Sequence, residues 1–76
     1  MPTLVRIGNL KIQMFADDHN PPHFHVVTPD YEALVQISDF AVLAGSIDGR
    51  SYDTAVAWAL ENRKVLEDEW SRLNER

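Results

Sequence analysis

The chain of 76 residues is long enough for one small domain, and a domain of this size buries a modest share of its surface, so contact with a partner chain would stabilise it. It contains no cysteine, which excludes disulfides and thiolate metal sites and fits a reducing cytoplasm. No apolar run approaches the roughly 18 residues that a membrane-spanning helix requires. The net charge of −5 argues against stand-alone DNA binding, because phosphate binding depends on cationic contacts, and it suits a basic partner. We therefore expect residues 1–76 to form a single cytoplasmic domain.

The first half of the chain alternates between apolar and polar residues, which is the pattern of half-buried strands. Gly8 and Asn9 separate the first two alternating runs as a hairpin turn, and Pro29 and Asp30 separate the last two. The pattern predicts four strands, over residues 3–7, 10–15, 23–28 and 32–37.

The two faces of the predicted sheet differ in character, as expected of an antiparallel sheet with one buried side. The apolar side collects Val5, Ile7, Leu10, Ile12, Met14, Phe24, Val26, Ala33, Val35 and Ile37. The opposite, polar side collects Arg6, Lys11, Gln13, His23, His25 and Gln36.

The second half changes to helical spacing. Residues 40–50 contain two glycines and no clear period, so we expect a loop with a short helical turn. Residues 51–74 lack glycine and proline and predict one helix, capped by Ser51 or Asp53. Its apolar stripe should lie across the sheet and consists of Val56, Ala59, Leu66, Trp70 and Leu73. Trp58 falls beside this stripe, where it either packs on the sheet edge or contacts a partner. The predicted fold is α+β: a four-stranded antiparallel meander followed by one long C-terminal helix packed on one face.

All three histidines lie in one segment, residues 17–26, which we call the histidine turn. Pro21 and Pro22 exclude helix there, because each proline fixes φ and lacks an amide proton. In the strand that follows, His23 and His25 should share a face, because alternate side chains point the same way.

Three interpretations of the histidine turn remain open. His23 and His25 could share a divalent transition metal, with His19 or Asp18 as a third ligand. Alternatively, an imidazole oriented by a carboxylate could act in acid–base chemistry on RNA, beside the basic Arg6 and Lys11 of the polar face. In the third interpretation the segment is framework: Asp18 and Asn20 hold the turn, and the histidines fasten it to a neighbouring strand.

The string Asp18-His19-Asn20-Pro21-Pro22-His23-Phe24-His25-Val26 resembles the signature of a small bacterial family known as domain of unknown function 4160 (DUF4160). The likeness extends over nearly the whole chain, including residues 1–3 and 12–15, Glu32-Ala33, Gly45, Ala57-Trp58 and Trp70. The chain departs from the family where relatives have Gly-x-Leu-Pro, since Gly45-Ser46-Ile47-Asp48 stands there.

The resemblance implies a function but no established catalytic mechanism. Relatives are encoded beside another small protein, and the pair looks like a toxin–antitoxin module in which this family is the toxin and translation is the target. We therefore expect a growth inhibitor that is neutralised by a cognate small antitoxin and engages the ribosome or RNA. The expected binding surface comprises Arg6, Lys11, Gln13, Asn20 and Trp58. The alternatives are a metal- or RNA-dependent hydrolase that uses Asp18, His19, His23 and His25, and an interaction module without toxicity; no cofactor is assigned.

Overall fold

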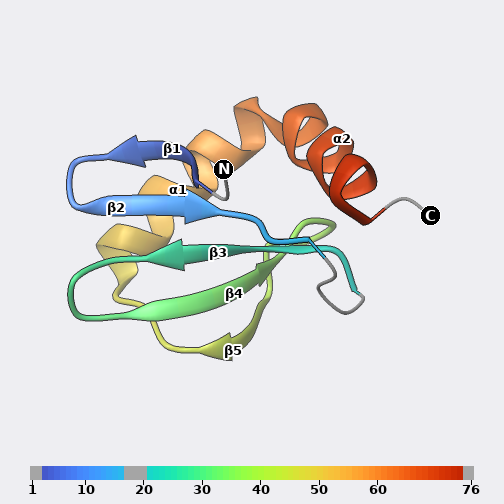
Figure 1. Cartoon of the computed structure of the whole chain (residues 1–76). Helices are drawn as coiled ribbons and strands as arrows, with labels where there is room; N and C mark the ends of the chain where they lie inside the picture. Colours follow the sequence, from blue (N-terminus) through green and yellow to red (C-terminus); the bar gives the residue numbers. More distant parts are fainter. Residues whose placement is uncertain (1–2, 17–20, 75–76) are drawn as a thin grey trace.

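The computed structural model describes residues 3–16 and 21–74 and has an α+β fold (Figure 1). Its five strands are β1 (Thr3–Ile7), β2 (Leu10–Gln13), β3 (His23–Val27), β4 (Glu32–Gln36) and β5 (Val42–Gly45), followed by helices α1 (Gly49–Glu61) and α2 (Arg63–Asn74). All neighbouring strands are antiparallel and the order is β1-β2-β3-β4-β5. The predicted fold class and meander are confirmed. The predictions of four strands and of one long helix were wrong.

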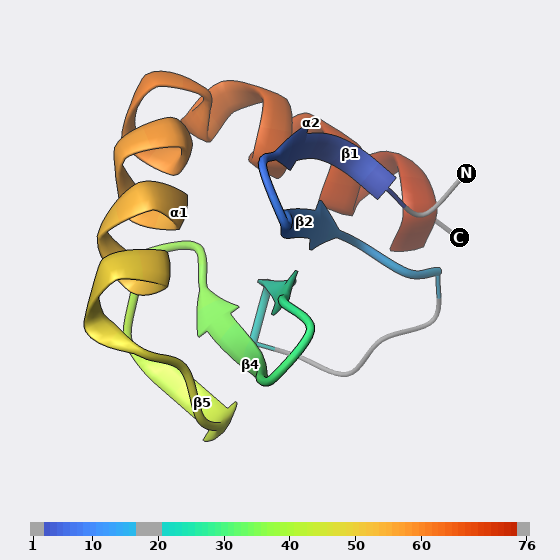
Figure 2. The same cartoon turned by 90° about the vertical axis from the view of Figure 1, so that its left-hand side faces the viewer.

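The core lies between one face of the sheet and the two helices (Figure 2). Eight of the ten residues predicted for the apolar face are buried; Val5 and Ile7 are partly exposed. The helices contribute four buried side chains to the same core, namely Ala55, Ala59, Leu66 and Trp70. Neither of these described helices is long and apolar enough to cross a membrane.

The fifth strand arises from the segment that was expected to be a loop. Phe40 has a φ of 60°, a conformation that is uncommon for a residue with a side chain, and it turns the chain back along β4. Its ring is buried near that of Phe24, with ring centroids 6.5 Å apart, and its carbonyl accepts a 2.6 Å hydrogen bond from the Tyr52 hydroxyl. Tertiary contacts therefore compensate for a backbone conformation that costs on the order of 1–3 kcal/mol.

The start of the first helix is set by a residue other than those predicted. Asp48 has extended backbone angles, and its side chain accepts a 3.1 Å hydrogen bond from the Ser51 amide, so Asp48 is the N-cap in place of Ser51 or Asp53. Hydrogen bonding from the Ser51 side chain, and next from the Ser51 amide, lowers the pKa of the Asp48 carboxyl below its ordinary value.

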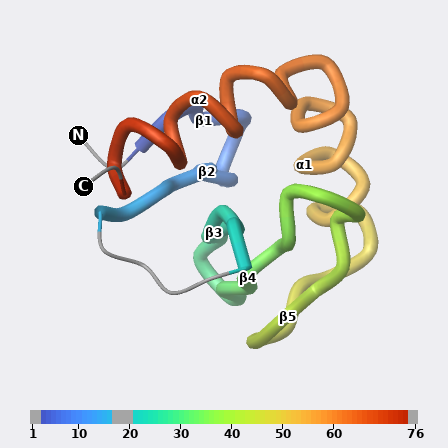
Figure 3. The backbone as a smooth tube through the Cα atoms, turned by 90° about the vertical axis from the view of Figure 1, so that its right-hand side faces the viewer, coloured from blue at the N-terminus to red at the C-terminus, as the bar shows by residue number. Residues whose placement is uncertain are grey.

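The break between the helices lies at Asn62, without glycine or proline. Its side-chain amide donates a 2.9 Å hydrogen bond to the Trp58 carbonyl, while its backbone amide bonds to Ala59 and its carbonyl accepts from Leu66. An asparagine side chain can compete in this way with the regular helix bonds. The resulting bend lets α2 pass beside β1 and β2, whereas β5 lies at the far edge of the sheet (Figure 3).

Candidate functional site

The histidine turn is described only from Pro21 onward. Asp18, His19 and Asn20, which were predicted as site residues, lie outside the described residues. The two prolines are exposed and lead into β3, where the remaining two histidines are found. The site is therefore built here from β3 and the elements around it.

His23 lies at the start of β3 and is buried, with 5% of its surface exposed. Its Nδ1 atom lies 2.8 Å from the Pro21 carbonyl oxygen, and because a carbonyl can only accept, Nδ1 carries the proton. The ring packs against the indole of Trp70 with centroids 5.2 Å apart. His23 was assigned to the polar face, but it is buried and its ring packs against Trp70 of α2, so His23 belongs to the packed framework of the domain.

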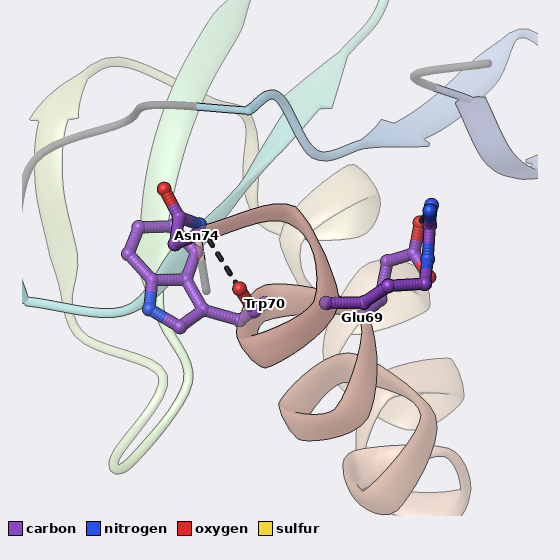
Figure 4. A network of polar contacts seen from close by, with 4 residues as sticks. Glu69, Trp70 and Asn74 are labelled. Atoms are coloured by element: carbon purple, nitrogen blue, oxygen red, sulfur yellow. Dashed lines mark hydrogen bonds and ion pairs between the residues drawn. The ribbon is translucent and has the colours of Figure 1, made fainter. Parts of the chain in front are cut away.

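Trp70 lies in the last turns of α2 (Figure 4). Its ring contacts that of His23. The Asn74 side-chain amide donates a 3.0 Å hydrogen bond to the Trp70 carbonyl, which satisfies an acceptor at the helix end. Glu69, on another side of the helix, pairs with the Arg72 guanidinium, and this hydrogen-bonded pair lowers the pKa of the Glu69 carboxyl and raises that of Arg72. The indole side of α2 is thus directed inward and its charged side outward.

His25 lies two residues further along β3, beside His23, as the strand period predicts; the ring centroids are 5.5 Å apart. Its Nδ1 atom lies 3.4 Å from Glu32 Oε2, and Phe15 meets its ring edge-on with centroids 4.8 Å apart. Its side chain is 13% exposed. A carboxylate and an aromatic ring therefore fix the orientation of an imidazole that reaches the surface at one edge.

Arg6, Lys11 and Gln13 form a strip of polar side chains that leads to His25. We call these three residues together with His25 the polar strip. Strand pairing places Arg6 opposite Lys11, and Gln13 opposite His25, so these side chains cross β1, β2 and β3 on the same face. Gln13 donates a 3.1 Å hydrogen bond to the hydroxyl of Thr3, and Arg6 is exposed. The structure thus brings four of the predicted residues together.

Trp58 is not part of this strip. It lies on α1, is partly buried and packs against the hydrophobic core. This placement agrees with the interpretation of Trp58 as a packing residue. The neighbouring apolar residues Leu60 and Val65 are the exposed ones, at 60% and 49%.

The described residues contain no group of three or more His, Cys, Asp or Glu side chains that could hold a metal ion. His23 and His25 supply two imidazoles, and the predicted third ligands, His19 and Asp18, lie outside the described residues. Phe15, Glu32 and Trp70, which surround the two histidines, were not predicted as site residues. Only Glu32 could have been found from the sequence, because the turn at residues 29–30 folds β4 back beside β3.

The comparisons with known proteins give one match. The model of the family described as domain of unknown function (DUF4160) matches residues 9–71, a range that contains the histidine turn and most of the polar strip. No curated protein and no solved structure matches the chain. Because the match covers most of the sequence, the chain belongs to the DUF4160 family.

Proposed function

We propose that this protein is the toxin of a toxin–antitoxin module: a cytoplasmic growth inhibitor that acts on translation and is neutralised by a cognate small protein. The proposal rests first on the resemblance of the histidine turn to a family regarded as toxins. It rests second on the surface that β3 presents, where an oriented imidazole lies beside cationic and amide side chains. We assign no cofactor.

The observation that carries the proposal is the polar strip with His25 at its end. Arg6 and Lys11 supply positive charge on a chain whose net charge is −5, and Gln13 and His25 supply hydrogen-bonding groups. Phosphate groups of RNA are bound by such cations, while amides and imidazoles recognise base edges or ribose hydroxyls. A small basic strip of this kind fits a local contact with ribosomal or other RNA better than extended DNA binding.

Induced expression in growing cells tests the proposal directly. The wild-type protein should arrest growth, co-expression of the small protein encoded beside it should restore growth, and a cell-free translation reaction should lose activity when the purified protein is added. Lys11→Ala and His25→Gln should weaken inhibition in both assays. Lys64→Ala is the matched control, since that lysine is 86% exposed and belongs to α2 rather than to the strands that carry the strip. Normal growth at a verified high level of the wild-type protein would reject the toxin hypothesis.

A second candidate, hydrolysis of RNA, is favoured by one observation, the 3.4 Å approach of His25 Nδ1 to the Glu32 carboxylate. A carboxylate can orient a histidine that acts as a general base. Incubation of RNA with the purified protein should then give defined cleavage products, and both His25→Gln and Glu32→Gln should abolish them. Inhibition of translation with intact RNA would instead support binding without catalysis.

A further inference from the structure

The outer edge of β5 is the most exposed apolar part of the sheet. All four residues of β5 are exposed, and its two large side chains, Val42 and Leu43, are 44% and 40% exposed. β5 ends the sheet, so among the described residues no strand pairs with its outer side (Figure 2). At the opposite edge, β1 is mostly half-buried and its exposed position carries a charge, Arg6. The β5 edge therefore exposes apolar side chains to solvent, whereas the β1 edge is mostly half-buried and exposes a charged one.

The sequence of this edge lacks the residues that normally prevent pairing. Residues 40–47 contain neither a charged side chain nor a proline, whereas exposed edge strands are commonly protected by lysine, by other charges or by proline. Acidic residues bracket the run on both sides, with Asp39 before it and Asp48 after it, and both are exposed. The nearest basic residues in sequence lie on the helices and reach the ends of this run: the charge of Arg50 acts on the Asp48 carboxyl, and Arg63 donates a 3.1 Å hydrogen bond to the Ser38 carbonyl.

The strand is also held in place by its own domain. Gly45 has a φ of 79° and lies so close to β4 that an added Cβ would come 2.1 Å from the Glu32 carbonyl oxygen. At the other end, the buried Phe40 is fixed through the hydrogen bond from Tyr52 to its carbonyl. An edge strand that is anchored at both ends offers a backbone already in the extended conformation, which lowers the entropic cost of adding another strand.

We propose that the outer edge of β5 binds an extended segment of a partner protein as a sixth strand, and that this segment has an uncharged centre and Lys or Arg at both ends. The centre would pair with β5 through backbone hydrogen bonds, and the basic ends would face Asp39 and Asp48. A second copy of this chain fits poorly, because antiparallel pairing of two β5 strands would set Asp39 of one copy opposite Asp48 of the other. This proposal concerns binding alone and stands whether or not the protein inhibits growth.

Selection from a random peptide library tests the proposal without requiring a named partner. Peptides of about nine residues, enough to cover an average strand with flanking residues, are selected on the full-length wild-type protein. The enriched sequences should alternate apolar residues between basic ends, and in NMR titrations they should shift the amide signals of residues 42–45. Their Kd should rise at least about tenfold for Leu43→Lys. The new lysine would lie beside the apolar centre of the bound peptide and would repel its basic ends.

Two further measurements keep the outcome decisive. Val42→Lys is a second edge variant, and Leu60→Lys is the control, since Leu60 is 60% exposed on α1 and should leave Kd unchanged. Circular dichroism establishes that each variant is folded. Failure to enrich any peptide, or equal binding to the edge variants and the control, would overturn the proposal. So would a wild-type dimer in sedimentation that Leu43→Lys dissociates, because β5 would then serve a second copy of the chain.

Discussion

The replacement His23→Ala tests whether this histidine is framework rather than surface. His23 is 5% exposed, and its ring donates one hydrogen bond to the Pro21 carbonyl and packs on Trp70. Loss of a hydrogen bond of this kind costs about 0.5–1.5 kcal/mol, and loss of an aromatic pair costs a similar amount. With a small cavity added, we expect a loss of about 2–4 kcal/mol in the free energy of unfolding.

This loss is large for so small a domain. At about 0.05–0.15 kcal/mol per residue, 76 residues give a total stability of about 4–11 kcal/mol. Urea denaturation followed by tryptophan fluorescence measures the change, since Trp70 contacts the replaced ring. His23→Phe keeps a ring but removes the Nδ1 donor, so it should recover the packing part of the loss and leave about 1 kcal/mol.

Lys64→Ala provides the baseline, because that side chain is 86% exposed and its replacement should stay within about 0.5 kcal/mol of the wild type. If His23→Ala is as stable as this control, then His23 does not contribute to the packed core and the assignment as framework is refuted. A large loss for His23→Ala with full recovery in His23→Phe would show that packing alone matters and that the Pro21 hydrogen bond contributes little.

Three further predictions concern the backbone, a cap and metal binding. Gly45→Ala should destabilise the domain in urea denaturation by more than Gly8→Ala, because both positions have positive φ but only the Gly45 Cβ would collide with Glu32; equal losses would contradict the close approach. Asp48→Asn keeps a capping side chain but removes the charge, so it should destabilise the protein modestly at neutral pH; because hydrogen bonds from the Ser51 side chain and the Ser51 amide lower the pKa of Asp48, the difference from wild type should disappear as the pH falls through that lowered value, and a difference that persists to about pH 2 would contradict a role for the charged carboxylate. Calorimetric titration with zinc at neutral pH should give no saturable binding, whereas one-to-one binding would restore the metal interpretation.

The strands could be predicted from the sequence where local pattern and tertiary structure agree. Alternation located β2 to β4 because each of them has apolar residues buried in the core alternating with less buried ones, and it located β1 although that strand is half-buried along most of its length. β5 has no such asymmetry, since its four residues are all exposed, and its position depends on the positive φ of Phe40. The end of α1 at Asn62 could not be predicted from the sequence either. It depends on the hydrogen bond from the Asn62 side chain to the Trp58 carbonyl, which the spacing of apolar residues does not indicate.

The sequence was sufficient to predict which strand residues come together at the candidate site, but not which of them are buried. The strand period placed His23 and His25 side by side, and the hairpin placed Arg6 beside Lys11. What could not be read from the sequence is the bend between the helices, which brings Trp70 against His23. A residue far along the chain therefore contributes to the burial of the first histidine of β3.

The two histidines of β3 consequently have different roles, although a single residue separates them and they share a face. His23 is bonded to the backbone of the turn that precedes it and covered by an indole, so a change there acts on the fold. His25 is oriented by Glu32 and Phe15 and retains an exposed edge next to the polar strip, so a change there can alter binding without unfolding the domain. A substitution at His23 that abolishes activity is thus uninformative about mechanism unless stability is measured as well. A loss of activity at His25 in a protein that remains folded would identify this imidazole as part of the functional surface.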